Sequence, residues 1–393
     1  MRNNNILKLL NLQGIILKKE KYSKNLIELW VECLLKEHIC PSCNSSTSRV
    51  HDYYTRSFNH IMVGKRTTKI YYKQRRYVCL HCGKRFAEKN SFIQKFYRHS
   101  NDVVNSVFDD LTSIKNLSQI GHDNNMSSQN VSRLMNKFMP IFHNTTSLPE
   151  AIGIDEFRGN SGGNKFQVVI TNLKTHKVID VISDRSEDAL YNFFRKISNP
   201  KNVKLVAMDL SLFFKKIIAD VFPNAKIIAD TFHFTRLMHW ALDNVRKEVQ
   251  KGLPKDMRIY FKRSRSVLHK RINDLNPDEY NQLTNMLDYN ENLRWAYSIV
   301  QNLFEIIDEK NPDKKVALFK EFMTYASNCD LPEFNKHIQT YFKWHKYIIN
   351  SFYTNYSNGI TEGLNTKIKT LKRVSFGFRN FQNFRLRILM ACS

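Results

Sequence analysis

The sequence predicts a multidomain α+β protein in which a later α/β core is interrupted by a helical insertion. Three observations support this class. The 393 residues exceed one typical domain, two Cys-x-x-Cys pairs lie before residue 90, and short β-branched runs begin at residue 150. The hydrophobic fraction of 42% is enough for more than one buried core.

The chain is strongly basic. It has 61 Lys and Arg residues against 36 Asp and Glu, a formal net charge of +25. This excess favours a polyanionic partner, most simply nucleic acid, and a solvated basic surface is the alternative. The sequence contains no run of ~18 apolar residues, so we expect no transmembrane helix. The start of the chain lacks the apolar core of a signal peptide. We therefore expect no membrane contact.

Residues 1–38 are interpreted as a lead-in. Apolar residues recur there with a helical period, at Leu26, Trp30, Cys33 and Leu34. We expect a helix in this stretch and assign it no function.

Residues 39–90 predict a zinc-binding, ribbon-like domain. Two Cys-x-x-Cys pairs, separated by thirty-five residues, supply the thiolates of a tetrahedral zinc site: Cys40, Cys43, Cys79 and Cys82. In a basic chain without a secretion signal, such pairs favour a metal over disulfides. The alternative is two unmetallated pairs. The histidines nearby could replace a ligand, but we expect ordinary surface residues at His38, His51, His60 and His81.

The same domain is predicted to contact DNA. Ten Lys or Arg residues and one acid, Glu88, lie between Arg56 and Lys89, and aromatic residues are interleaved with them. Alternating stretches such as residues 69–78 predict β-strands. The predicted phosphate contacts are Arg75, Arg76, Lys84 and Arg85.

Residues 98–140 predict a helix-turn-helix domain. Helical segments at 103–108, 117–121 and 127–134 include a turn at Gly121 before a helix with a serine cap. Other three-helix packing units would give a similar pattern. If the unit is a helix-turn-helix, the residues that face the DNA groove are Ser128, Gln129, Ser132 and Arg133.

Residues 150–235 predict the first part of a catalytic core. Strand-like runs at 152–157, 166–171 and 177–182 precede a helix from Ser186 and two buried runs, 203–208 and 226–229. Three antiparallel strands followed by helix-linked parallel ones is the order of the RNase H fold. Acids stand at the ends of three of these runs, and neighbouring strand ends meet in that fold: Asp155, Asp209 and Asp230.

Residues 236–350 predict the helical insertion, with breaks at Pro254, Pro277, Pro312 and Pro332. Basic residues between Arg246 and Arg271 form either a DNA-facing surface or a solvated helix face.

Residues 351–393 predict a helix with a third acid, Glu362, and a basic end. Ile360, Leu364, Ile368 and Leu371 recur at helical spacing, which places Glu362, Asn365 and Lys369 on the opposite side. Seven positive residues and no acid lie between Lys367 and Arg387, interleaved with aromatics, as suits contacts with DNA phosphates and unpaired bases. The alternative is a final helix whose Phe residues fill the core and whose Arg residues face solvent. The predicted DNA contacts are Lys367, Lys369, Lys372, Arg373 and Arg379.

Several motifs, in order along nearly the whole chain, resemble the bacterial ISL3-family transposases. They are Cys-Pro-x-Cys with Cys-x-x-Cys-Gly, Gly-Ile-Asp155-Glu, Met-Asp209-Leu-Ser, Ala-Asp230-Thr-Phe-His233-Phe, Ser-Asn-Gly-Ile-Thr-Glu362-Gly-Leu-Asn and Lys372-Arg-Val-Ser-Phe-Gly-Phe. The resemblance implies a DDE transposase with an RNase H-like core. It assigns the catalytic, metal-binding acids as Asp155, Asp209 and Glu362. Asp230 and His233 match the D(2)H signature of such enzymes, and His233 either orients a phosphate or nucleophile or packs beside the site.

The chemistry explains why the site needs carboxylates. DNA cleavage and strand transfer are in-line displacements at two metal ions ~3.5–4 Å apart. Mg²⁺ prefers oxygen ligands, so we expect Mg²⁺ (or Mn²⁺) at the acids and structural Zn²⁺ at the cysteines.

The expected function is therefore that of an insertion-sequence transposase that binds terminal inverted repeats, cleaves DNA and joins it to target DNA. Two alternatives remain: a zinc-ribbon/helix-turn-helix regulator without catalysis, and an RNase H-like nuclease that cuts without joining. The three acids argue against the regulator, and two DNA-binding domains argue against the nuclease. Because two ends must be brought together, we expect a homodimer or higher assembly. We expect it in the bacterial cytoplasm, associated with the nucleoid.

Overall fold

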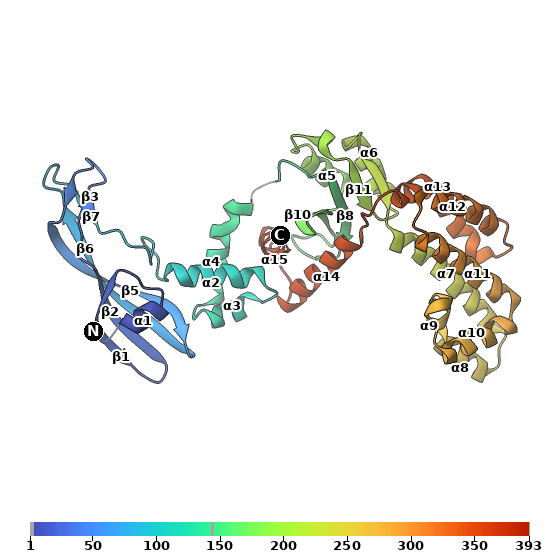
Figure 1. Ribbon diagram of the computed structural model, residues 1–393, viewed down its shortest axis with the longest axis horizontal. Helices are drawn as coiled ribbons and strands as arrows, with labels where there is room; N and C mark the ends of the chain where they lie inside the picture. Colours follow the sequence, from blue (N-terminus) through green and yellow to red (C-terminus); the bar gives the residue numbers. More distant parts are fainter. Residues whose placement is uncertain (1–3, 143–144, 393) are drawn as a thin grey trace. The chain divides into compact units, whose positions relative to one another are not determined.

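The computed structural model describes residues 4–142 and 145–392 (Figure 1). The chain divides into two compact units, Met1–His143 with Arg373–Phe376, and Asn144–Lys372 with Gly377–Ser393. Each is described by itself. Within the described ranges, no helix is long and apolar enough to cross a membrane.

The first unit contains a five-stranded sheet in the order β1-β2-β6-β5, with β7 paired to β6. Strands β2 and β6 are parallel, and the other pairs are antiparallel. A short hairpin, β3 with β4, carries the first Cys-x-x-Cys pair. The elements are α1 (Asn4–Leu9), β1 (Ile15–Tyr22), β2 (Leu26–Cys33), β3 (His38–Ile39), β4 (Ser46–Thr47), β5 (Val50–Val63), β6 (Arg66–Val78) and β7 (Arg85–Ala87).

The helix predicted around Leu26–Leu34 is wrong, because this segment is strand β2. Its side chains alternate between buried and half-buried along the whole strand, the period of two that a sheet imposes. Trp30 stacks on Tyr71 of the neighbouring strand, with ring centroids 4.8 Å apart. The apolar positions at 26, 30 and 33 also fit a helical period, so pairing with β1 and β6 decided between the two.

Two histidines that were expected at the surface are buried in this unit. His60 is 1% exposed, with its ring nitrogens 2.6 Å from Ser100 Oγ and 2.7 Å from the carbonyl of Leu10. His38 is 7% exposed and packs against Tyr77. Both therefore have structural roles, and neither stands in as a metal ligand.

Three helices follow in the first unit, as predicted: α2 (Asn101–Thr112), α3 (Leu117–Asp123) and α4 (Ser128–Phe138), with a 3₁₀ turn η1 (Met139–Phe142). Ser127 caps α4 by accepting a hydrogen bond from the backbone N–H of Asn130. Gly121 lies inside α3 and not in the turn. A Cβ there would stand 2.6 Å from the carbonyl oxygen of Met126, so Gly121 lets the turn pass close to the helix.

The second unit contains a five-stranded sheet in the order β10-β9-β8-β11-β12. The pairs β8–β9 and β9–β10 are antiparallel, whereas β8, β11 and β12 are parallel neighbours. This confirms the predicted succession of an antiparallel meander and helix-linked parallel strands. The strands are β8 (Ala151–Phe157), β9 (Gln167–Asn172), β10 (Lys177–Ile182), β11 (Leu205–Met208) and β12 (Lys226–Ala229).

Helices connect and extend this sheet. The four predicted breaks stand where helices begin, since Pro277, Pro312 and Pro332 are first-turn residues and Pro254 caps α8. The elements are α5 (Glu187–Phe194), η2 (Pro200–Asn202), α6 (Leu212–Val221), α7 (Thr231–Lys251), α8 (Lys255–Arg263), α9 (Arg265–Leu268), η3 (Ile272–Asp274), α10 (Pro277–Tyr289), α11 (Glu291–Asp308), α12 (Pro312–Ser327), α13 (Pro332–Phe352), α14 (Gly359–Val374) and α15 (Phe381–Cys392).

The helical region shares one hydrophobic core with the sheet. Helix α7 begins directly after β12, and α13 packs against that strand and against α7 (Figure 1). Asn350 donates a hydrogen bond to the carbonyl of Ile227, and the Tyr341 hydroxyl donates to that of Phe234. Residues 231–352 thus extend the core at the β12 edge of the sheet.

Two predictions about the last helices are wrong. Asn365 was placed on the polar side of α14, but it is buried on one face with Thr361, Ile368 and Leu371. Its side-chain NH₂ group donates a hydrogen bond to Asp155, as described below. In α15, the Phe residues enter the core as the alternative foresaw, but Arg387 is fully buried instead of facing solvent.

Candidate metal centres and nucleic-acid contacts

The four cysteines converge in the first unit. The Sγ atoms of Cys40 and Cys82 are 3.6 Å apart, those of Cys43 and Cys79 are 3.5 Å apart, and all four lie within 4.8 Å of one another. All four are free thiols. Four sulfur ligands at such spacing suit tetrahedral zinc.

Each Cys-x-x-Cys pair forms the same local turn. The N–H of Asn44 donates to the carbonyl of Cys40, and the N–H of Gly83 donates to that of Cys79. Asn44 and Gly83 both have positive φ, 58° and 71°, which the turn requires. Hydrogen bonds from Ser45 lower the pKa of Cys43 to about 5, so this sulfur is disposed to act as a thiolate ligand.

Three acids of the second unit lie in one row at the sheet. Met208 of β11 is opposite Ile154 of β8 and Ala229 of β12. Asp155, Asp209 and Asp230 each follow one of these residues, so they occupy the next position on three neighbouring parallel strands. Parallel strands deliver the acids to the same edge of the sheet, as the sequence predicted.

His233 connects two of these acids. As the third residue of α7, its Nδ1 lies 2.5 Å from Asp209 Oδ1 and 3.5 Å from Asp230 Oδ2. Burial alone would lower the pKa of His233, but the Asp209 carboxylate reverses this effect and leaves it raised. Asp209, Asp230 and His233 form a group whose potential ligand atoms lie within 4.8 Å of one another.

Helix α14 and the residue before it, Asn358, are hydrogen-bonded to two of the acids. Asn365 Nδ2 donates to Asp155 Oδ2 over 2.6 Å, and Asn358 Nδ2 donates to Asp209 Oδ1 over 3.3 Å. Both amides are 1% exposed, and their Oδ1 atoms have no partner among the described residues. Glu362 lies between them in sequence, in the first turn of α14, with its side chain exposed.

The close packing of α14 depends on two small residues of the sheet. The Thr361 Oγ1 lies 2.8 Å from Thr171 Oγ1 of β9, in the core. Gly153 leaves room for both, because a Cβ there would stand 2.5 Å from Thr171 Oγ1. Sequence reasoning found Asn365 but missed the contact from Asn358. The sequence signal for this contact was that Asn358 precedes Glu362 by four residues, about one helical turn.

Crowding of negative charge changes the protonation of these acids. Burial raises the pKa of Asp155 to about 7, and the negative charge of Asp209 adds to this. The pKa of Asp230 is also raised, first by burial and further by Asp209 and Glu362. Glu362 therefore acts electrostatically on the row. Neither it nor Asp155 belongs to a described group of three ligands within 4.8 Å.

The oxygen donors present fit a hard divalent cation. The site offers carboxylates and two orphaned amide oxygens, which are the ligand types that Mg²⁺ accepts. A bound cation would also offset the burial and the repulsion from Asp209 that together raise the pKa of Asp155.

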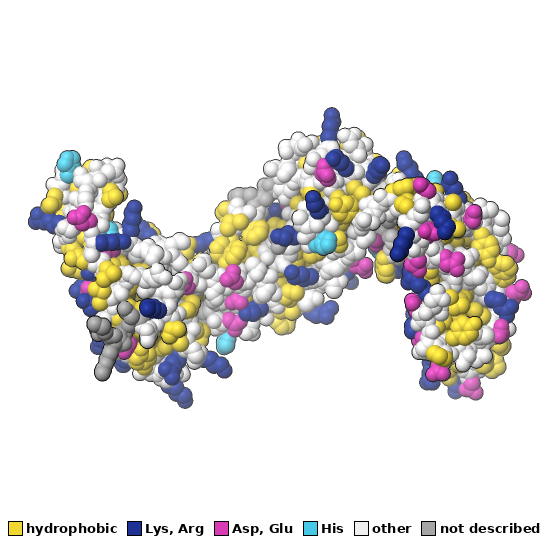
Figure 2. All heavy atoms as spheres, viewed as in Figure 1, with side chains coloured by type: hydrophobic (Ala, Val, Ile, Leu, Met, Phe, Trp, Pro, Cys, Tyr) yellow, Lys and Arg dark blue, Asp and Glu magenta, His cyan; other side chains and the backbone are white. Residues whose placement is uncertain are grey.

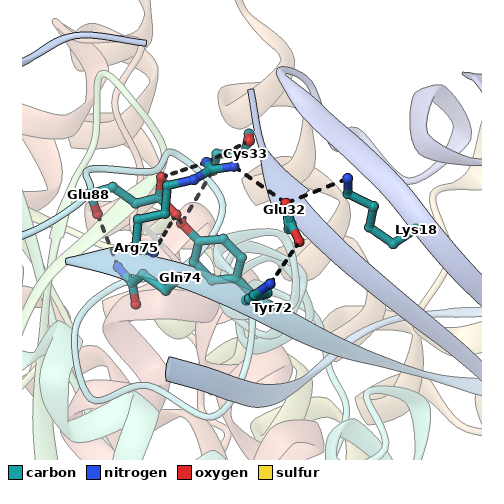
Figure 3. A network of polar contacts seen from close by, with 8 residues as sticks. Lys18, Glu32, Cys33, Tyr72, Gln74, Arg75 and Glu88 are labelled. Carbon is teal, nitrogen blue, oxygen red and sulfur yellow. Dashed lines mark hydrogen bonds and ion pairs between the residues drawn. The ribbon is translucent and has the colours of Figure 1, made fainter. Parts of the chain in front are cut away.

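Arg75, a predicted DNA contact, is buried in a polar network of the first unit (Figure 3). Its guanidinium donates to the carbonyl of Cys33 over 2.9 Å and to Glu88 Oε2 over 3.3 Å. Glu88 also accepts from the Tyr72 hydroxyl over 2.6 Å. Arg75 is 6% exposed, so it holds β6 to β2 and the segment after β7 and is not available to phosphates.

Most other predicted DNA contacts are accessible. Arg76 is exposed and ion-paired with Asp52, whereas Ser128, Ser132, Lys367 and Lys372 are half-buried. Lys367 donates to the carbonyl of Ala391, and Lys372 donates to that of Arg158. The exposed ones are Lys84, Arg85, Gln129, Arg133, Lys369, Arg373 and Arg379. Lys and Arg side chains are spread over both units in Figure 2.

Comparisons with known proteins cover both regions of the chain. Residues 152–388 match the family model of the ISL3-type DDE transposases, described as "Transposase". Residues 36–82 match that of the "zinc-finger of transposase IS204/IS1001/IS1096/IS1165". The first match contains all the acids above and the second contains the four cysteines, which identifies their cluster as the structural zinc site of a zinc ribbon.

Three curated relatives are informative. The chain is 21% identical over 386 residues to the transposase for insertion sequence element IS1001 of Bordetella parapertussis, covering 93% of this chain and 91% of that one. It is 23% identical over 257 residues to the transposase for insertion sequence element IS1557 of Mycobacterium tuberculosis, covering 59% of this chain and 57% of that one. A Lactococcus lactis protein named ATP-dependent protease is 37% identical over 99 residues, covering 25% and 30%.

Proposed function

The chain belongs to the ISL3 family of transposases, and from this premise we propose that it is the DDE transposase of an insertion sequence. It binds the terminal inverted repeats of its element, cleaves the DNA there and joins the ends to target DNA. The catalytic acids are Asp155, Asp209 and Glu362. One observation carries this assignment: α14, the helix of Glu362, is hydrogen-bonded to both Asp155 and Asp209.

The core is RNase H-like in this proposal. Its support is the order β10-β9-β8-β11-β12, in which an antiparallel meander adjoins two parallel strands. Asp155 of β8 and Asp209, the residue after β11, accept hydrogen bonds from the segment that carries the third acid.

The acids are proposed to hold Mg²⁺ or Mn²⁺. When bound, such ions activate the attacking oxygen and stabilise the leaving one in an in-line displacement at phosphorus. The chain's own contribution is to fix the carboxylates. Hydrogen bonds from Asn365 and Asn358 fix the carboxylates of Asp155 and Asp209 in the positions from which they would bind a cation.

His233 is proposed to act on the same reaction. Its Nδ1 contacts Asp209, which keeps the ring oriented and favours its protonated form. A protonated ring next to the acids can donate a hydrogen bond to a non-bridging phosphate oxygen of the scissile group. Asp230, buried behind the ring, keeps it from turning away.

DNA recognition is assigned to the first unit and to α14. The zinc ribbon contributes Arg76, Lys84 and Arg85, and α14 and its following turn contribute Lys369, Arg373 and Arg379. Helices α3 and α4 form a helix-turn-helix, in which exposed Gln129 and Arg133 face the groove together with Ser132. Synapsis of two element ends requires at least a homodimer, which would work at the bacterial nucleoid.

The decisive experiment incubates purified protein with element-end DNA and Mg²⁺, and compares the wild type with Glu362→Gln. We expect end cleavage and joining into a second DNA by the wild type, and neither reaction by the variant. Glu321→Gln, an exposed glutamate of α12, is the matched control and should react normally. Specific binding without cutting by the wild type would favour a regulator, and cutting without joining would favour a nuclease.

A further inference from the structure

Helix α7 carries a stripe of aromatic and basic side chains that begins beside the acid site. Phe232, Arg236 and Trp240 are four residues apart, so they share one face along about 12 Å of the helix. Phe232 is 49% exposed and Trp240 is 46% exposed. We call these three residues the α7 stripe. Large apolar side chains held open to solvent in this way mark binding surfaces when they are contiguous.

The stripe is continuous with the site of catalysis. The ring of Phe232 lies edge-on to that of His233, with centroids 5.7 Å apart. His233 in turn contacts Asp209. A ligand that covers the stripe therefore extends directly to the acids.

Arg236 stands between the two aromatic residues with its charge uncompensated. Its guanidinium carbon is 5.3 Å from the ring centroid of Phe232 and 4.9 Å from that of Trp240. Among the described residues, no carboxylate pairs with it, and its buried Nε has no hydrogen-bond partner. The arginines Arg246 and Arg265 differ, since both pair with Asp243. Arg236 is thus a basic group that can pair with an external anion.

Trp240 also lines a cavity of about 490 Å³ between α7 and the start of α13. Two lysines and two acids line it, and one of these acids, Asp243, also pairs with Arg246 and Arg265. Asn244 and His337 supply hydrogen-bonding groups at its wall. An aromatic wall with polar partners suits a planar heterocycle such as a nucleobase, and the surplus of basic groups suits the phosphates of its strand.

We propose that the α7 stripe and its cavity bind an unpaired nucleotide of the DNA strand that is processed at the acid site. Its base stacks on Trp240 and meets Asn244 and His337 in the cavity. Its phosphate pairs with Arg236, and Phe232 guides the strand towards His233. This inference rests on the proposed function and deepens it, because it specifies a DNA end that is locally single-stranded beside the cleaved bond.

The physical reason for this ligand is the combination of groups. Exposed aromatic faces with an arginine bind single-stranded nucleic acid, in which bases are free to leave their stack. A duplex keeps its bases stacked inside, so it cannot use the ring of Trp240. A protein partner is the other occupant to test, because Trp and Arg also form the centres of protein interfaces.

The test measures DNA binding by the full chain in a buffer without added Mg²⁺ and without chelator, which prevents cleavage and leaves the structural zinc in place. The probes are a fluorescein-labelled duplex with a short oligothymidine tail and the same duplex with blunt ends, followed by anisotropy. Trp240→Ala should weaken binding of the tailed duplex roughly tenfold to a hundredfold, the effect of one lost stacked base. Binding of the blunt duplex should stay unchanged. Arg236→Gln should lower the slope of log affinity against log salt for the tailed duplex by about one, the value of one phosphate contact.

Trp295→Ala is the matched control. Trp295 is also 46% exposed and lines a cavity of about 440 Å³, but this cavity has two acids and no basic residue. We expect no change in either affinity. Equal losses for Trp240→Ala and Trp295→Ala, equal losses on tailed and blunt DNA, or no loss at all would each overturn the proposal. Melting curves of all variants check that the fold is retained.

The nucleotide site and the proposed transposase reaction can be contradicted independently. If the wild type cleaves and joins DNA while Trp240→Ala binds tailed DNA normally, the nucleotide site is wrong and the transposase stands. If tailed binding depends on Trp240 but no DNA is cleaved, the nucleotide site stands and the proposed reaction is wrong.

Discussion

The zinc cluster and the acid site gather their ligands in opposite ways. Each Cys-x-x-Cys pair is shaped by a local turn with its own hydrogen bonds, and the pairing of β5 with β6 brings the two turns together. The acids come from β8, the ends of β11 and β12, and α14, across 208 residues from the first to the last. The cysteines all lie within 4.8 Å, whereas Asp155 and Glu362 remain outside the group formed by Asp209, Asp230 and His233.

This difference agrees with the two roles assigned above, a structural zinc site and a proposed reaction site. Four thiolates complete the coordination of zinc and leave no open position. The acid site brings Asp209 and Asp230 together beside His233, and amide groups donate hydrogen bonds to Asp155 and Asp209. Burial and the nearby negative charge of Asp209 raise the pKa of Asp155, so this site costs stability at neutral pH.

Loss of an acid should have the largest effect, on reaction alone. Asp209→Asn removes a carboxylate and the partner of His233 together, so DNA cleavage should fall on the order of a thousandfold or more. Gel assays of end cleavage measure this, and gel shifts should detect normal end binding. Asp220→Asn, an exposed change on α6, is the control. Retained cleavage would remove Asp209 from the site.

Loss of a cysteine should have the opposite profile, acting on folding. Cys43→Ser should release zinc and destabilise the ribbon by several kcal/mol, since metal binding and folding of such domains are coupled. A colorimetric zinc assay and thermal melts measure both effects. Cys329→Ser, a half-buried thiol outside the cluster, should retain all zinc. Normal zinc content in Cys43→Ser would contradict the assignment.

Asp155 should make the acid site destabilising at neutral pH. Its pKa is raised from an ordinary value of 3.8 to about 7, so folding stability from this group is full below pH 4 and declines as pH rises through 7. The shift corresponds to roughly 4 kcal/mol at most. Asp155→Asn removes the decline caused by burial and by Asp209. Without added Mg²⁺, its melting temperature should exceed that of the wild type at pH 8 and match it more closely at pH 4.

Added Mg²⁺ completes that measurement. A bound cation favours the ionised form of Asp155, so it should stabilise the wild type above pH 7 more than it stabilises Asp155→Asn. Equal stabilisation of the two proteins would separate Asp155 from the metal site.

The amides of α14 should have a moderate effect that is confined to catalysis. Asn365→Ala removes the hydrogen bond that holds the Asp155 carboxylate. Loss of a residue that holds a metal ligand typically lowers metal affinity or activity by roughly ten- to a hundredfold. Titration of cleavage rate with Mg²⁺ should show a higher requirement. Asn350→Ala, which loses a bond to the backbone of Ile227, should lower stability without changing the Mg²⁺ requirement.

The smallest effect concerns the surface of the ribbon. Arg85→Gln should lower the slope of log affinity against log salt by about one, as for one phosphate contact. Arg76→Gln should change it less, because Asp52 already neutralises Arg76. Equal slopes for the wild type and Arg85→Gln would show that Arg85 does not contact DNA.

Much of the fold was predictable because its patterns are local. Strand β10 and strand β12 have the predicted bounds, and the four predicted prolines mark helix starts. Segment 26–34 was mispredicted because its apolar residues fit both a helix and a strand, and only its pairing with two neighbours selected the strand. The predicted division at 235/236 falls inside α7, whose core is continuous with the sheet.

The sequence by itself determined the four cysteines of the zinc cluster and the row of acids on the parallel strands. Spacing identified the cysteines, because a knuckle is a local structure, and strand-end acids followed from the alternation of strands and helices. Tertiary structure decided how those residues are used. It buried Arg75 against Glu88, turned Asn365 inwards to Asp155 and set Asn358 on Asp209. These outcomes depend on desolvation and on partners distant in sequence, which no local pattern encodes.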